Sequence, residues 1–221
     1  MKNTVADNIL AFLSSKTVMT IIIIVLSIII IFLVYKNIDS IKAPVDFKKE
    51  KTKREKQVIQ KLKDIRASQL IYKSIHNEFA PTFDTLIDFL KNGKIPVVKM
   101  IPDPEDTTFT KTINDTLRWD IVADYLFPDS VIKNRHNFSL DNISVIPFTD
   151  GENFKLEAGT IIKGNLTVHV FECSALFTSI LKGMDEQMVF NMVTKMKQLE
   201  QFPGLKVGSM TEPSIDGNWE Y

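Results

Sequence analysis

The sequence predicts an α+β protein that begins with a single N-terminal transmembrane helix. Three observations lead to this fold class. An uncharged apolar run lies near the amino terminus, apolar residues then recur at helical spacing, and short β-branched runs separated by turn residues fill the second half. We therefore expect a transmembrane helix, a long amphipathic helix, and a small α+β domain with a short antiparallel β-meander and a C-terminal helix.

Length and composition narrow the function classes. The chain has 221 residues, with 27 basic and 27 acidic side chains, so its formal net charge is zero. This balance argues against broad electrostatic affinity for nucleic acid, which needs a basic face. A single cysteine, Cys173, excludes an intramolecular disulfide framework and a cysteine-based zinc knuckle. Once an anchor is subtracted, the remaining length suits one domain.

The predicted anchor covers residues 18–35 and begins VMTIIIIVLSIIIIFLV. Its Ile, Val, Leu and Phe side chains favour membrane insertion by roughly 4 to 8 kcal/mol. The run is too long for a signal peptide and no small-residue cleavage site follows, so we expect a retained single span. It contains no Asp, Glu or His, so it is not expected to carry protons. Residues 1–17 are either a short interfacial helix or the frayed start of the anchor.

The charges around the span do not agree with the orientation that we expect for the chain in the membrane. A plain positive-inside count places the carboxyl side in the cytoplasm, because most lysines follow the span. Most of that cluster begins only at Lys48 and is mixed with acidic residues. A short amino tail with a large carboxyl domain is a common build for envelope proteins. We expect the carboxyl domain to be periplasmic, chiefly because of the resemblance described below.

A connector and a long helix are predicted next. Residues 36–47 are interpreted as a juxtamembrane connector in which Pro44 interrupts any continuous helix. The soluble domain, 48–221, then starts with an amphipathic helix that ends near Asn77. Its basic first part, KKEKTKREK (48–56), is interpreted as a solvated helix face. Contact with anionic lipid headgroups or with an acidic partner is the alternative.

The middle of the chain predicts a second helix, a loop and a short third helix. Thr82 is the expected N-cap of the second helix, and Asn92-Gly93 its end. The stretch KMIPDPEDTTFT (99–110) is rich in Pro and Asp and predicts an exposed loop. A short helix is expected over 121–127, stopped by a proline.

The second half predicts strands and then a helix. Strands are expected over 143–148, 154–158 and 166–171, with turns between them. The final helix is expected to begin near Asp185 and to stop at Pro203-Gly204. The remaining tail is turn-rich and ends in two aromatic residues that could dock onto the domain.

No residue set predicts catalysis, a cofactor or a metal. His76, His136 and His169 lie in different predicted elements, and His169 is too far from Cys173 to share a directly bound metal. His76 and Glu78 lie at an expected helix end, where a histidine commonly meets the helix dipole.

The acidic groups lead to the same conclusion. Asp84 and Asp88 are expected to face water, since the apolar stripe occupies other positions of their helix. The loop acids Asp103, Glu105 and Asp106 lack the register that positions oxygen ligands around calcium. The nucleotide-binding and hydrolase motifs are missing from the sequence. We therefore expect no enzyme activity, no small-molecule substrate and no nucleic-acid partner.

A family resemblance rests on several quoted stretches. These are LKDIRASQLIYKSIHNEFAPTFDTLIDFLKNGKIPVV, IPF, HVFECSA, GMDEQM and the terminal FPGLKVGSMTEPSIDGNWEY. Together they resemble a family of short, single-pass, largely uncharacterised envelope proteins of the Bacteroidota. The resemblance covers essentially everything after Pro44. It implies a bacterial inner-membrane address and carries no established activity.

A looser resemblance is to the pseudopilins of secretion systems and type IV pili. Those proteins have an apolar amino-terminal helix, a continuing amphipathic helix and a segment like AQ-x-x-Y, which Ala67, Gln69 and Tyr72 echo here. The Gly-Phe processing site and the glutamate that follows it are missing, and Pro44 interrupts the expected spine helix.

The function expected from the sequence is a non-enzymatic accessory or scaffold subunit of an envelope-spanning machine, either secretory or Ton-like and energy-transducing. Its partners would be the membrane and integral membrane subunits of that machine. A polymerising, pseudopilin-like subunit is the alternative, and a membrane-tethered enzyme or ligand-binding protein is the remote one.

Overall fold

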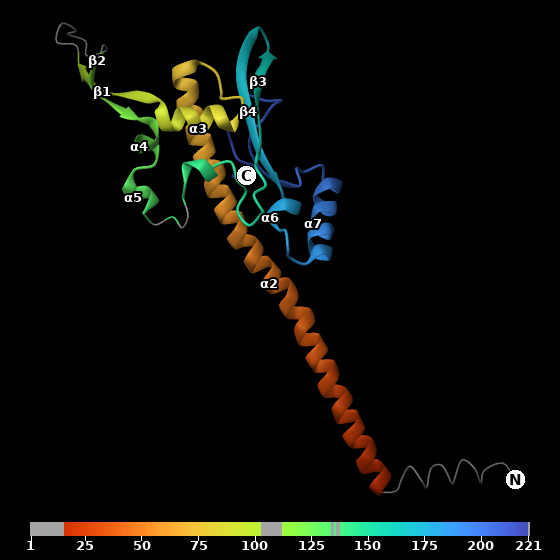
Figure 1. The fold of residues 1–221 in the computed structure, drawn as a ribbon. Coiled ribbons are helices and arrows are strands. Elements are labelled where there is room, and N and C mark those ends of the chain that lie inside the picture. Colours follow the sequence, from red (N-terminus) through yellow and green to blue (C-terminus); the bar gives the residue numbers. More distant parts are fainter. Residues whose placement is uncertain (1–15, 103–111, 134, 136–137, 221) are drawn as a thin grey trace, which may run out of the picture. The chain divides into compact units, whose positions relative to one another are not determined.

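The fold comes from a computed structural model that describes residues 16–102, 112–133, 135 and 138–220 (Figure 1). It is a mixed structure of helices and two small antiparallel sheets. The chain divides into two compact units, Met1–Glu50 and Lys51–Tyr221. We call the second unit the head.

The first unit contains the start of helix α2, which runs over Lys16–His76. Its stretch Lys16–Tyr35 is long and apolar enough to cross a membrane. The hydroxyls of Thr20 and Ser27 each donate to the carbonyl four residues earlier, at 2.8 Å. A bilayer requires polar groups to be satisfied within the helix in this way. The predicted 1–17 tail lies outside the described residues up to position 15.

The prediction that Pro44 interrupts the helix is wrong. Helix α2 continues through Pro44, so the expected connector over 36–47 is helical. A proline removes its own N–H bond and crowds one carbonyl, at about 3 kcal/mol. Helix propagation on both sides offsets that local loss, since each added residue contributes a hydrogen bond once a helix is nucleated.

Within the head, α2 lies between two groups of elements (Figure 1). The side chains of Val58, Leu62 and Ile65 are fully buried there. The helix ends at His76, as predicted, and the next residue, Asn77, takes a positive φ of 60°. That left-handed conformation is a common way for a helix to stop.

On one side of α2 lie α3 (Phe83–Asn92), α4 (Val122–Leu126) and the sheet of β1 (Lys94–Pro102) and β2 (Thr112–Ile121). Helices α3 and α4 confirm the sequence predictions, and the Thr82 side chain caps α3 by accepting a bond from the Thr85 N–H.

The loop predicted over 99–110 is wrong for its first part, because β1 extends to Pro102, and the rest lies outside the described residues. The prolines of this stretch predict an end of regular structure, yet an edge strand tolerates proline.

The segment before the second sheet also departs from prediction. Helix α5 covers Asp129–Ile132 and the 3-10 helix η1 covers Leu140–Asn142. The strand predicted over 143–148 is wrong, because this stretch makes only the isolated bridge between Val145 and Asn153. Ile143 and Ile146 are buried in a turn rather than in a strand ladder, and the periodicity of so short a run cannot distinguish the two.

The second sheet has the order β3 (Lys155–Lys163), β4 (Leu166–Leu176), β5 (Gly204–Gly208), all antiparallel. The predicted second and third strands correspond to β3 and β4, but both are longer than expected. Strands β3 and β4 form a hairpin. The strands are ordered as in a meander, but two helices lie in the connection between β4 and β5, where a true meander has a short turn.

These two helices are α6 (Phe177–Ile180) and α7 (Glu186–Gln198). Asp185 caps α7 by accepting a 2.8 Å bond from the Met188 N–H, so the predicted start is confirmed. This helix is not the last element, because β5 follows it. Strand β5 was missed, since its five residues follow Pro203 and resemble the end of a helix.

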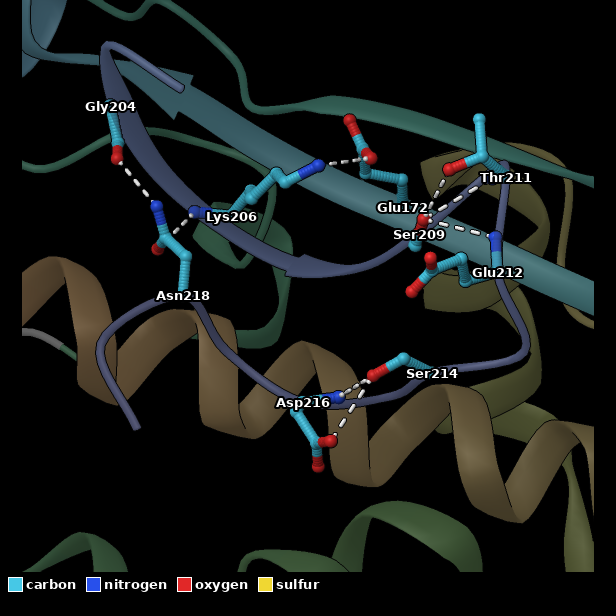
Figure 2. A network of polar contacts seen from close by, with 9 residues as sticks. All are labelled: Glu172, Gly204, Lys206, Ser209, Thr211, Glu212, Ser214, Asp216 and Asn218. Atoms are coloured by element: carbon cyan, nitrogen blue, oxygen red, sulfur yellow. Dashed lines mark hydrogen bonds and ion pairs between the residues drawn. The ribbon is translucent and has the colours of Figure 1, made fainter. Parts of the chain in front are cut away.

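The chain beyond β5 folds back along that strand (Figure 2). Asn218 donates to the Gly204 carbonyl at 2.9 Å and accepts from the Lys206 N–H at 3.0 Å. A bridge joins Val207 to Gly217. The Lys206 ammonium lies 2.9 Å from Glu172 on β4. The tail therefore docks on β5 through the Asn218 contacts and the Val207–Gly217 bridge. Trp219 is half-buried, and the other terminal aromatic residue, Tyr221, lies outside the described residues.

Gln69 joins the end of α2 to the segment that leads into α3. Its side chain is fully buried and makes two hydrogen bonds with one residue, Ala80. The amide donates to the Ala80 carbonyl at 3.0 Å and accepts from the Ala80 N–H at 2.8 Å. Because a buried backbone group needs a partner, this amide fixes where the chain turns back.

We expect Gln69→Met to lower the free energy of unfolding of the full chain by about 2 to 4 kcal/mol. Methionine fills similar space but leaves both backbone groups of Ala80 unsatisfied in the core. Gln57→Met is the matched control, because Gln57 is exposed on the same helix and a surface change of this kind stays within about 0.5 kcal/mol. Chemical denaturation in detergent measures both, and equal effects would contradict this role for Gln69.

Candidate functional site

The polar groups of RASQLIYKSIHNEF (66–79) do not converge on one site. Arg66 points to the carboxyl-terminal tail, where its guanidinium lies 3.0 Å from the Glu220 carboxylate. Glu220 also accepts a hydrogen bond from the Gly217 N–H, and this bond and Arg66 hold the pKa of Glu220 below its ordinary value despite some burial. Arg66 therefore fixes the tail to α2.

His76 belongs to an aromatic cluster instead. Its ring stacks on Tyr72 with centroids 4.1 Å apart, and meets the edge of Phe89 at 5.4 Å. Its Nδ1 lies 3.2 Å from the Tyr72 carbonyl. Glu78 is exposed and no contact joins it to His76 within the described chain. This arrangement matches a structural role at the helix end.

The remaining candidate ligands are also dispersed. His169 lies opposite Thr160 on the β3–β4 hairpin, while Cys173 is fully buried under the sheet. Burial raises the pKa of the Cys173 thiol far above its ordinary value, so it is inert toward metals and oxidants. Among the described residues, no three His, Cys, Asp or Glu side chains gather as a metal site requires. His136 and the acids of 103–106 lie outside the described residues.

Asp84 and Asp88 face water, as predicted. Asp88 accepts a 2.7 Å hydrogen bond from the Asn92 amide on the next turn of α3. The two carboxylates therefore decorate the surface of α3.

A buried polar cluster on α2 was not predicted. Asp64 is only 7% exposed and forms an ion pair with Arg135 at 2.7 Å. Gln60 donates to the same carboxylate at 3.0 Å. Lys61, one residue along the turn, donates to the carbonyls of Asn142 and Val145. These contacts join α2 to the chain between α5 and β3, which has little regular structure of its own.

The cluster shifts two pKa values in opposite directions. Burial raises the pKa of Asp64, and the hydrogen bonds from Arg135 and Gln60, together with the positive charges of Arg135 and Lys61, oppose that rise only in part. Burial likewise lowers the pKa of Lys61, with Asp64 opposing. Both shifts follow from desolvation, the usual effect of burial on a charged group. No sequence pattern marks the cluster, because Arg135 is far from α2 along the chain.

The part of the basic segment that belongs to the head is largely engaged with it. Lys51 pairs with Glu55 at 2.7 Å and lies over the Phe177 ring. Arg54 donates to the carbonyls of Ile180 and Lys182, at 3.2 and 2.9 Å. The interpretation of this stretch as a purely solvated face is therefore wrong for Lys51 and Arg54, which hold α6 against α2.

An open apolar hollow of about 400 Å³ lies between α6 and α7. Leu181, Val189 and the exposed Phe190 line it. Lys182 stands at the rim but already pairs with Asp150 at 2.9 Å. Because polar groups do not converge in it, the hollow offers apolar contact rather than a built ligand site.

The β1–β2 sheet exposes several neighbouring apolar side chains. Register places Pro96 opposite Trp119, and alternation puts Ile121 on the same side. Trp119 is 62% and Leu117 60% exposed. The opposite side carries the buried Ile95 and packs on the head. The register shifts between Val97 and Val98, where Leu117 has no partner residue. We call the exposed apolar residues of this sheet the ribbon face; its members are Pro96, Val98, Leu117, Trp119 and Ile121.

Comparison with known proteins gives no relative from which a role could be transferred: no family model, curated protein or solved structure matches this chain.

The raised pKa of Asp64 predicts a pH dependence of stability. A carboxyl whose pKa is higher in the folded state contributes stability that is fully present below its unfolded pKa and is lost as the pH rises through the folded value. The wild type should therefore gain stability relative to Asp64→Asn as the pH falls from 7 toward 4. Denaturant midpoints of the two proteins at both pH values measure this. A difference that stays constant, or moves the other way, would contradict it.

Proposed function

We propose that this protein is a non-enzymatic accessory or scaffold subunit of an envelope-spanning machine, anchored in a bacterial inner membrane by one helix. The single observation that carries the proposal is the ribbon face. It exposes an aromatic and several aliphatic side chains on a two-stranded sheet. Contiguous apolar surface of this kind typically marks a protein–protein interface.

The anchor supports the membrane part of the proposal. The stretch Lys16–Tyr35 carries no charge between its end lysine and Tyr35, and its two internal hydroxyls are satisfied within the helix. Such a helix can pack against other membrane helices but has no group to carry an ion. Its expected neighbours are the polytopic subunits of a secretion or Ton-like complex.

The fate of the candidate polar groups supports the non-enzymatic part. Arg66, His76 and Asp64 each serve a contact that holds two parts of the head together. A catalytic group instead needs to meet substrate in a cleft with a second functional group beside it. The ribbon face offers Trp119, a residue type enriched among the energetic centres of interfaces.

The proposed periplasmic placement of the head rests on the family resemblance. The plain count of positive residues points the other way. Cysteine labelling at an introduced surface position separates the two. Labelling by an impermeant reagent before the inner membrane is opened supports the periplasm, and labelling only afterwards overturns it.

A pseudopilin-like subunit is the second candidate. The continuity of α2 through Pro44 favours it, because a pilin spine is one long helix. Intact-mass measurement separates the two candidates. A chain cleaved within its first twenty residues supports the pilin reading, and an uncleaved chain supports the scaffold.

We expect the double variant Leu117→Ser, Trp119→Ser to lose its co-purifying membrane subunits while remaining folded. Both side chains are exposed, so the head does not need them for its own core. Phe190→Ser is the control, because Phe190 is similarly exposed, at 64%, but lies on α7. Gentle-detergent purification and mass spectrometry give the readout. A wild type that emerges without other subunits, or a double variant that keeps them, would contradict the proposal.

A further inference from the structure

The outer edge of β3 is open in the head. On its inner side every residue from Lys155 to Lys163 is in register with β4. At the start of the strand the outer side is occupied, because the Phe154 N–H donates to the Ser144 carbonyl at 2.8 Å. Beyond that point, from Leu156 to Ile162, no backbone hydrogen bond joins the outer edge to another part of the described chain.

Two observations determine which residues of β3 direct their backbone N–H and C=O groups toward the free edge. The turn between β3 and β4 has two central residues, and of these only Gly164 has a positive φ, 65°, as a type II′ turn requires. In such a hairpin the closing pair, Lys163 and Leu166, exchanges hydrogen bonds, and outward and inward residues then alternate. The outward set is therefore Leu156, Ala158, Thr160 and Ile162. The outward bond of Phe154 agrees with this alternation.

The other edge of the same sheet is closed. Along β5, the tail supplies backbone partners: Gly208 donates to the Asp216 carbonyl and Asn218 donates to the Lys206 carbonyl, both at 3.0 Å. Within the described residues, the tail therefore covers one edge of the sheet and the other edge is open. An uncovered edge is a template for pairing with another strand.

The pattern of charges along β3 identifies the strand that fits. We propose that two copies of this chain pair through their β3 edges, antiparallel, about a two-fold axis at Thr160. Thr160 then faces its own equivalent, and Ala158 faces Ile162 of the second copy. All three are outward residues, so about six backbone hydrogen bonds can form across the axis. This inference does not rest on the proposed function.

In this register, Glu157 of each copy faces Lys163 of the other. These are non-hydrogen-bonded pairs, in which opposing side chains approach most closely, at roughly 4.5 Å between Cα atoms. In the single chain Glu157 pairs with Lys155 at 2.9 Å on an exposed surface, whereas Lys163 has no ion-pair partner in the described chain. Two symmetric ion pairs thus use charges that the isolated head leaves exposed.

The same charges disfavour the neighbouring arrangements. A two-fold at Ala158 places Lys155 opposite Ile161 and Glu157 opposite Gly159, and forms no ion pair. In a parallel pairing in register, every charge on β3 faces its own copy, which is destabilising. The charge pattern therefore favours the Thr160 register among these arrangements.

Apolar contacts point the same way. Ile162 is 80% exposed, which is unusual for a large aliphatic residue within a strand. Beside Ala158 of the second copy, part of that surface is covered. The paired span, from Glu157 to Lys163, also ends before Phe154, where Ser144 already occupies the edge.

Cysteine cross-linking of the full chain in detergent tests the axis. With a mild oxidant, Thr160→Cys should give a disulfide-linked dimer, because Cα atoms of a hydrogen-bonded pair lie roughly 5.5 Å apart, within the disulfide range. The control is Thr167→Cys, on β4, whose equivalents are more than three strand spacings, roughly 14 Å, apart. The native Cys173 is buried and does not compete. Equal cross-linking of both variants, or none with Thr160→Cys, overturns the proposal.

A charge swap tests the register. Glu157→Lys and Lys163→Glu should each weaken the cross-linking of Thr160→Cys, or the dimer in analytical ultracentrifugation, by about tenfold. The double swap should restore it, because the ion pairs return with reversed polarity. Single variants without effect, or a double variant as weak as the singles, overturn the register. If Thr160→Cys forms a disulfide with a different protein and none between two copies of this chain, the proposed self-pairing is wrong.

Discussion

The head depends on one constraint, which is that its part of α2 buries polar groups among apolar ones. Gln69 needs the backbone of Ala80, and Asp64 needs Arg135. A buried polar group without its partner is far more costly than an absent one. These pairings therefore specify which distant segments lie against the helix, while Val58, Leu62 and Ile65 supply the apolar contact that any segment could share.

Polar side chains of α2 also hold other segments of the head in place. The Asp64 cluster holds the irregular chain between α5 and β3, which has no ladder to fix it. Arg54 holds α6, and Arg66 holds the carboxyl-terminal tail. Asp64, Arg54 and Arg66 thus each reach a different, remote part of the chain. Those side chains are engaged in holding the head together, whereas the ribbon face and the β3 edge are exposed in the described chain.

The sequence predicted what local chemistry determines. The uncharged run before Tyr35, the Thr82 cap and the Asp185 cap each follow from signals within a few residues. It failed where remote contacts decide. Ile143 and Ile146 are buried without belonging to a strand, and β5 forms by pairing with the distant β4. Pro44 predicts a break in the helix, but α2 continues on both sides of it.

The candidate site shows the same division. The sequence indicated that the histidines and paired aspartates lack a catalytic arrangement, and those in the described chain are dispersed. The ribbon face could have been found from the alternation of Leu117, Trp119 and Ile121, a period of two that the surrounding prolines obscured. The Asp64–Arg135 pair could not, since nothing in one sequence couples positions that far apart.

The proposed function requires that another protein of the membrane-bound assembly covers the ribbon face. Hydroxyl-radical footprinting of Trp119 tests it most directly, in native membranes and after full detergent purification. Trp119 is 62% exposed in the isolated chain, whereas Trp219 is partly buried by the chain's own tail. We expect Trp119 to be protected in membranes and to become reactive on purification, while the reactivity of Trp219 does not change. Equal reactivity of Trp119 in both states would contradict it.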